Sequence, residues 1–244
     1  MIKYFMGSVY SDFRELDSYW GYRVDNHARY EFTEKGLRMS MGPTEALYYS
    51  NVEIADGEFD ELPWGSGVFE ARIRLEGTHF GSAGWGFWNH SMRVDQSHPI
   101  WFIYLRTIGR YPLNGFFIQV GRRFQPIKLF RGLRLYYLGL KTLPWLAPIE
   151  ILSPKPVFQD LELGDWHTYR IEWGEKAAAF YIDGKRISMV HVDAGVRCRA
   201  DIWLDNAVFN PPSGRDSARV YRHVTHENRR VTTLEVDWVR VYVE

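Results

Sequence analysis

The chain has little cysteine, little helical periodicity and no long apolar run. Its one cysteine, Cys198, allows no intrachain disulfide, which excludes the framework of small disulfide-rich secreted domains. At 244 residues the chain is long enough to bury a core without such a staple. No apolar run approaches the roughly 18 residues of a membrane-spanning helix, and the first residues lack the apolar core of a signal peptide. We therefore expect a cytoplasmic protein, with a secreted mature form as the rival.

Acidic residues are missing from one long interval. The chain carries 30 Lys and Arg against 30 Asp and Glu, and this zero net charge argues against a globally basic nucleic-acid-binding protein. Between Asp95 and Glu150, however, there is no acid, and the interval holds eight bases: Arg106, Arg110, Arg122, Arg123, Lys128, Arg131, Arg134 and Lys141. The rest of the chain has 22 bases and 30 acids. The balanced total therefore hides a basic interval within an acidic chain.

Short strand patterns recur along the chain, each bounded by turn residues. Residues 67–75 and 167–173 alternate apolar with polar side chains, which is typical of a sheet with one face in water. Asp183-Gly184 separates two strand patterns and predicts a hairpin, and residues 234–243 form a last β-rich segment. These patterns predict an all-β protein. Because the turns are spread between strands and none forms a linker, we expect a single domain over residues 1–244.

Residues 121–162 do not share this pattern. Their middle mixes large apolar and basic residues without a clean period, and the second half is interrupted by Pro144, Pro148, Pro154 and Pro156. We expect an insertion or long loop that lies over the sandwich.

One string gives the chain a specific resemblance. Residues 165–173, DWHTYRIEW, resemble the D-F-H-T-Y-x-I-E-W segment of glycoside hydrolase family 16, and other strings appear in that family's order. They are residues 12–20 for the opening "D-E-F…W", 67–74 for "G-x-F-E-A-R-I-K", 85–88 for "W-P-A-F-W", 180–184 for "F-Y-V-D-G", 203–208 for "I-L-N-L-A-V" and 236–242 for "V-D-Y-V-R-V-Y". The resemblance covers nearly the whole chain. It implies the concanavalin A-like lectin/glucanase fold, a jelly roll of two antiparallel sheets, one convex and one concave.

The resemblance stops at the family's catalytic strand. The family is a retaining one, which needs two carboxylates about 5–5.5 Å apart, and it supplies them as E-x-D-x-x-E or E-x-D-x-E on one strand. That strand comes after the "A-F-W" strand, so it corresponds here to residues 99–106, PIWFIYLR, which contain no acid. A one-residue shift only exchanges Trp101, Ile103 and Leu105 for Phe102, Tyr104 and Arg106 on the concave face. We therefore expect no hydrolysis by the family's usual strand.

The remaining candidates fall into a binding group and an acid/base group. On the concave face, Trp203 and Asp205 share one side of their strand, with the ring suited to stacking on a sugar and the carboxylate to its hydroxyls. Core packing of Trp203 and a structural role for Asp205 are the alternative. The predicted ligand-binding residues are Trp88, Trp101, Tyr104, Arg106, Trp203 and Asp205. Weaker candidates for a relocated acid or base are Asp205, Asp95, His90 and His98, the last three in a loop that an exposed polar turn explains equally well.

Asp237 corresponds to an acid that helps to bind a structural calcium in part of the family. Calcium takes six to eight oxygen ligands, so a single Asp is weak evidence, and a buried ion pair with Arg240 or Arg170 is the alternative. No other cofactor is expected.

The leading hypothesis is a non-hydrolytic relative of the family that binds a carbohydrate or related ligand in its concave groove. A diverged enzyme with relocated acid/base residues is the first rival. The basic, aromatic interval 106–141 suggests a second rival, a module that contacts an anionic ligand, a membrane surface or another protein. Its apolar residues could equally complete the core while its charges stay solvated.

Overall fold

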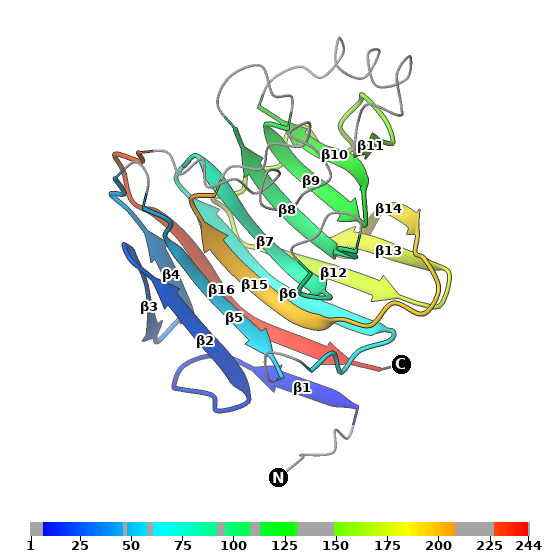
Figure 1. Ribbon diagram of the computed structural model, residues 1–244, viewed down its shortest axis with the longest axis horizontal. Coiled ribbons are helices and arrows are strands. Elements are labelled where there is room, and N and C mark those ends of the chain that lie inside the picture. The colour runs from blue at the N-terminus through cyan, green and yellow to red at the C-terminus, as the bar shows by residue number, and fades with distance from the viewer. Residues whose placement is uncertain are drawn as a thin grey trace.

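The computed structural model describes residues 7–45, 48–57, 61–91, 96–107, 113–130, 149–207 and 227–243. All regular structure in this part of the chain is β-strand, so the all-β prediction is confirmed (Figure 1). In the same residues there is no helix long and apolar enough to cross a membrane.

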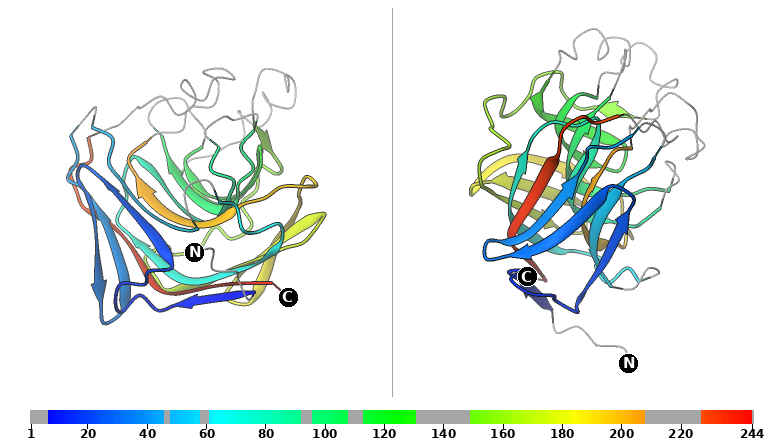
Figure 2. Two further views of the ribbon diagram at one scale, coloured as in Figure 1. Left: turned by 60° about the horizontal axis from the view of Figure 1, so that its bottom comes forward. Right: turned by 90° about the vertical axis from the view of Figure 1, so that its left-hand side faces the viewer.

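The strands form two sheets that stack as curved layers (Figure 2). The convex sheet runs in the order β14-β13-β12-β6-β16-β4-β3, with β1 also paired to β16. Its strands are β1 (Ser8–Ser11), β3 (Ala28–Thr33), β4 (Gly36–Met41), β6 (Gly67–Glu76), β12 (His167–Trp173), β13 (Ala177–Ile182), β14 (Lys185–His191) and β16 (Thr232–Tyr242).

The concave sheet has the order β11-β10-β9-β8-β7-β15-β5-β2. Its strands are β2 (Trp20–Asp25), β5 (Asn51–Asp56), β7 (Gly81–Trp88), β8 (Ile100–Arg106), β9 (Gly115–Val120), β10 (Arg123–Leu129), β11 (Glu150–Ile151) and β15 (Arg199–Asp205). Every pairing in this sheet is antiparallel except that of β10 with β11. Strands distant in sequence, such as β5 and β15, thus become neighbours.

Local sequence explains the strands that were predicted. β12 occupies residues 167–173, and its apolar positions Tyr169, Ile171 and Trp173 are buried while the residues between them are partly exposed. At the tip of the β13–β14 hairpin, Asp183 and Gly184 both have positive φ, at 51° and 75°. Two such residues make the turn whose twist matches that of the flanking strands, and Asp-Gly suits it well.

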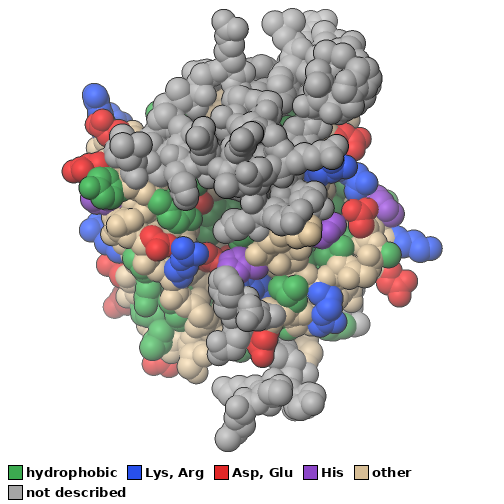
Figure 3. All heavy atoms as spheres, viewed as in Figure 1, with side chains coloured by type: hydrophobic (Ala, Val, Ile, Leu, Met, Phe, Trp, Pro, Cys, Tyr) green, Lys and Arg blue, Asp and Glu red, His purple; other side chains and the backbone are tan. Residues whose placement is uncertain are grey.

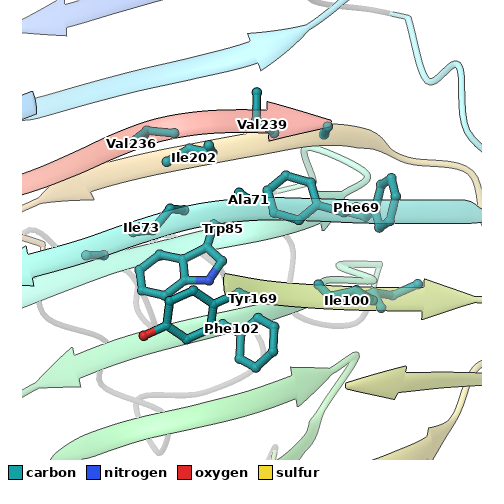
Figure 4. Close-up of a cluster of buried hydrophobic side chains, with 14 of the residues drawn as sticks. Phe69, Ala71, Ile73, Trp85, Ile100, Phe102, Tyr169, Ile202, Val236 and Val239 are labelled. Atoms are coloured by element: carbon teal, nitrogen blue, oxygen red, sulfur yellow. The ribbon is translucent and has the colours of Figure 1, made fainter. Parts of the chain in front are cut away.

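The core lies between the two sheets. Trp85 from β7 and Phe102 from β8 meet Tyr169 from β12, with ring centroids 4.7 and 5.1 Å from that of Tyr169 (Figure 4). Ala71 and Ile73 on β6 pack in the same layer of wholly buried side chains. The inner face of the concave sheet therefore packs against the convex sheet. Only its outer face, called the concave face below, remains to carry a site.

The expectation of a loop from residue 121 onward is wrong for its first part. Residues 123–129 form β10, which pairs with β9, because Phe124 and Ile127 are apolar positions that the sheet can bury. After the short strand β11, the main chain of Val157 and Phe158 donates to the carbonyls of Pro126 and Ile127. Residues 131–148, where the expected loop would lie, fall outside the described residues.

The inner strands of the concave sheet are buried on both faces. All residues of β5, β7, β9 and β15 are buried, and so are all but the last of β8. A second apolar cluster covers the outer face of β8, β9 and β10. The sheet on which the resemblance places a cleft therefore carries a densely packed outer surface.

Candidate functional site

Strand β8 has three apolar side chains on its concave face. Trp101, Ile103 and Leu105 belong to the outer apolar cluster, whereas Ile100, Phe102 and Tyr104 belong to the core between the sheets. The three outward residues are only 1–5% exposed. This places Trp101, Ile103 and Leu105 on the concave side, and none of them can exchange a proton.

Three tryptophans pack together beside this strand. The ring centroids of Trp101 and Trp203 are 4.3 Å apart, and those of Trp88 and Trp101 are 5.5 Å apart. Each indole N–H has a protein acceptor: Trp88 donates to Ser97 Oγ, Trp101 to Gln119 Oε1 and Trp203 to Ser82 Oγ, at 2.8–3.1 Å. The three rings thus lie together on the concave face. Whether they contact a ligand stays a prediction.

Asp205 holds Trp203 in place through Ser82. The Ser82 hydroxyl donates to Asp205 Oδ1 at 2.8 Å and accepts from Trp203 Nε1 at 2.9 Å. The Trp203 ring then lies over Gly84 of the neighbouring strand, where a Cβ atom would come within 2.2 Å of Trp203 Cη2. Gly84 is therefore required for the indole to lie flat against the sheet. The carboxylate, the serine and the glycine together fix the ring.

The environment of Asp205 favours its neutral form. Burial raises the pKa of Asp205 to about 7, although hydrogen bonds from the Ser82 hydroxyl and from the main chain of Ser82 and Ala207 oppose this rise. A carboxyl group with a pKa near neutrality is suited to exchange protons at physiological pH. Asp205 is thus the one sequence-predicted acid in the described residues with such a property.

A buried ion pair lies further along the same face. Arg199 Nη2 is 3.0 Å from Glu53 Oε1 and 3.1 Å from His90 Nε2, and His90 Nε2 is 3.7 Å from Glu53 Oε1. Burial, followed by the charges of Arg199 and Arg23, lowers the pKa of His90 to about 4, so His90 is neutral at pH 7. Figure 3 shows acidic, basic and histidine side chains close together near the middle of this view.

Asp201 lies beside this pair. It alternates with the inward-facing Ala200 and Ile202, which puts its carboxyl on the concave side. Burial and then the charge of Glu53 raise the pKa of Asp201 well above its usual value. The Oδ1 atom of Asp201 is buried and has no hydrogen-bond partner among the described residues.

Sequence reasoning missed Glu53, Arg199 and Asp201. Their signal was the alternation of polar and apolar residues in NVEIAD and RADIWLD, which puts the polar residues at alternate positions of β5 and β15 on one face. That face could be identified from sequence, but the contact of Arg199 with Glu53 depends on a pairing between residues 146 positions apart.

Two predicted ligand contacts are wrong. Tyr104 points into the core, where its hydroxyl donates to the His79 carbonyl at 2.9 Å and its ring stacks on that histidine. Arg106 shares the side of Tyr104, and its guanidinium lies 4.7 Å from the centre of the Phe80 ring. Because side chains alternate along a strand, neither can share the concave face with Trp101.

The acid/base candidates predicted in the loop before β8 do not lie in one cluster. His90 reaches the ion pair, whereas the main-chain N–H of His98 donates to Asn89 Oδ1 and the His98 carbonyl accepts from Cys198. The two histidines therefore have different partners. Asp95 lies outside the described residues.

Asp237 pairs with an arginine that sequence reasoning did not name. Arg72 Nη1 is 2.6 Å from Asp237 Oδ2, while Arg240 and Arg170 both lie near Glu70, so the expected partners were wrong. Asp237 is the extra residue of a bulge in β16, where the register with β6 shifts between Val236 and Trp238. The described residues contain no group of three or more His, Cys, Asp or Glu that could hold a metal ion.

Two bases of the basic interval, Arg123 and Lys128, lie close to acidic side chains. Lys128 Nζ is 2.8 Å from Glu162 Oε1, and Arg123 lies 3.7–3.8 Å from carboxylate oxygens of Glu150 and Asp193. Acidic residues from outside the basic interval thus lie against these two bases. Contact with a membrane surface stays a prediction.

Comparisons with known proteins give the fold. No family model and no curated protein matches the sequence. A Bacillus licheniformis β-glucanase superposes with a TM-score of 0.55 at 14% identity, over 98% of each chain. A glycosidic hydrolase gives 0.53 at 15% identity, over 97% of this chain and 95% of that one. A lichenase from a mouse hindgut metagenome gives 0.50 at 14%, over 98% and 100%. The chain thus has the jelly-roll sandwich of these glucanases, and at such identities the likeness concerns the fold alone.

Proposed function

We propose that this chain binds a carbohydrate or a related ligand on its concave face and does not hydrolyse it. The observation that carries the proposal is the concave side of β8, where Trp101, Ile103 and Leu105 stand in the strand that corresponds to the family's catalytic one. Glycoside hydrolysis needs two carboxyl groups about the scissile bond, and apolar side chains supply neither an acid nor a nucleophile.

Binding is supported by the aromatic and polar composition of the same face. Trp88, Trp101 and Trp203 form an aromatic cluster on this face, and Asp205 on β15 and Glu53 on β5 lie on the same face. Aromatic rings pack on the C–H faces of sugars while a few placed polar groups fix orientation, which is the usual division of work in a ligand site.

The proposal is tested with a panel of neutral β-glucans and galactans, measured for binding by calorimetry and for cleavage by reducing-end release. We expect binding without release, and a Trp203→Phe variant that binds about tenfold more weakly, a loss of about 1.4 kcal/mol. Trp166→Phe is the matched control, because Trp166 stacks on Arg72 and Arg74 of the convex sheet. Absence of binding to every glycan would refute the proposal.

A second candidate is an enzyme with a relocated acid or base. It is favoured by Asp205, whose pKa of about 7 suits proton exchange. His90 and His98 are weaker candidates. Reducing-end release that disappears in Asp205→Asn would establish this candidate in place of the first.

A further inference from the structure

The polar end of the concave face holds more acid than base. Its side chains come from β2, β5 and β15, and they are Arg23, Asp25, Asn51, Glu53, Arg199, Asp201 and Asp205. Arg23 pairs with Asp25 at 2.9 Å and Arg199 with Glu53 at 3.0 Å. Among the described residues, no base lies within ion-pair distance of Asp201 or Asp205. Neither carboxyl group thus has a direct ion-pair partner in the described strands, although the charge of Arg199 acts on Asp201.

Asp201 has a buried carboxyl oxygen that lacks a hydrogen-bond partner among the described residues. The residue is only 1% exposed, and in the described part of the chain its Oδ1 atom has no hydrogen-bond partner. An unmade hydrogen bond of this kind costs about 1–3 kcal/mol, and such groups in native proteins require a specific explanation.

The residues paired with Asp201 are small. Its register partners are Gly86 on β7 and Ala55 on β5, which contribute at most a methyl group. Beyond Gly86, the next strand presents Trp101 at the same level. Two strand spacings, about 9.6 Å, therefore separate the strand of the carboxyl from that of the aromatic ring, with no side chain between them at Gly86.

Resting on the proposed function, we propose that Asp201 hydrogen-bonds a hydroxyl group of the ligand and that the ligand is a neutral carbohydrate. Only a small polar group can reach so buried an oxygen, and a hydroxyl is such a group. The sugar ring then lies toward Trp101 and Trp203, so one ligand contacts both the Asp201 carboxyl group and the aromatic cluster.

The charges on this face and the hydrogen-bond chemistry of Asp201 favour an uncharged ligand. Burial and then the charge of Glu53 raise the pKa of Asp201, against the opposing charge of Arg199, which favours the protonated form of the carboxyl group. A protonated carboxyl both donates and accepts, as a sugar hydroxyl does, whereas a carboxylate only accepts. A uronic or sulfated sugar would bring its charge close to Glu53 and Asp205, and like charges at an interface disfavour binding. Acidic polysaccharides, which the basic interval suggested, are thereby disfavoured at this face.

Two variants separate this role from its alternatives. Asp201→Asn keeps a neutral group that donates and accepts, so we expect affinity for neutral gluco-oligosaccharides within about threefold of wild type. Asp201→Leu keeps the volume but removes both functions, and we expect at least about a tenfold loss, the equivalent of one hydrogen bond. Asp201→Leu also loses the hydrogen bond that the Ile202 main chain donates to the carboxyl group, so its urea midpoint should fall slightly, whereas that of Asp201→Asn, which keeps an acceptor, should not.

The measurement is calorimetric titration with matched neutral and uronic oligosaccharides of equal length, with Asp237→Asn on the convex sheet as control. We expect the uronic ligand to bind at least about tenfold more weakly. Equal affinity of Asp201→Leu and wild type would refute the contact while leaving the proposed function intact. An equal loss in both variants, or tighter binding of the uronic ligand, would refute the neutral form. If wild type binds neither ligand, the proposed function fails and the inference with it.

Discussion

Replacement of Asp205 by Asn should change stability in a pH-dependent way. In the folded protein the pKa of Asp205 is about 7, against an ordinary value of 3.8. Between these values the folded state holds a proton that the unfolded state releases, so this group's contribution to stability is fully present below 3.8 and is lost as pH rises through 7. Asn cannot ionise, and its Oδ1 can accept from Ser82 as the protonated acid does.

The expected magnitude comes from the distance between these two pKa values. Raising the pH from about 5 to about 8 removes about 3 kcal/mol of stability from wild type through Asp205 alone, and none from the variant. The difference in unfolding free energy, variant minus wild type, should therefore rise by about 3 kcal/mol over that range. His79 and His90, whose pKa values burial lowers to about 4, titrate in both proteins and cancel in this difference.

The assay is urea unfolding at about pH 5, 6, 7 and 8, monitored by tryptophan fluorescence and by circular dichroism. Glu175→Gln, a change at an exposed carboxyl between β12 and β13, is the control and should show a flat difference. A difference for Asp205→Asn that stays constant within about 0.5 kcal/mol would show that Asp205 ionises normally, and would refute the reasoning from burial.

Two further predictions concern buried ion pairs. Arg199→Met should destabilise the protein by about 3–5 kcal/mol because it leaves Glu53 buried without its cation. In urea unfolding, the double variant Glu53→Gln, Arg199→Met should recover more than half of that loss, and strictly additive effects would contradict the coupling. On the convex sheet, Glu235 accepts from both Arg38 and Arg74, and its pKa lies below the ordinary value because of these two partners against the opposing effect of burial. Its contribution is present above 4.5 and is lost as pH falls through the lower pKa of the folded state. Glu235→Gln should therefore cost about 1–2 kcal/mol at about pH 7 and progressively less as the pH falls below 4.5 in thermal unfolding, and a cost that does not change with pH would rule this out.

Much of the fold could be predicted because the two faces of a strand appear in the sequence as alternating apolar and polar residues. The alternation in β12 and the Asp-Gly turn fix local structure by side-chain period and backbone sterics, both of which act within a few residues. The same reasoning identified Trp203 and Asp205 as neighbours on one face, and the relay through Ser82 agrees with it.

The parts of the site that were not predicted depend on contacts between residues distant in sequence, which no local pattern indicates. Tyr104 was misplaced because β8 is apolar on both faces, so alternation could not decide its register by itself. Glu53 and Arg199 were missed because only the pairing of β5 with β15 brings them together. Asp237 was assigned the wrong arginine because the bulge in β16 shifts the register with β6 by one residue.

The double burial of β8 limits how this protein can be redesigned. Acids grafted at positions 101, 103 and 105 would enter a cluster where Trp101, Ile103 and Leu105 now have almost no contact with solvent. An unpaired ionised carboxyl in such surroundings takes up a proton or unfolds its neighbourhood, and loss of the Trp101 ring would also leave a hole beside Trp203. Glucanase chemistry therefore cannot be introduced by three substitutions on β8 alone.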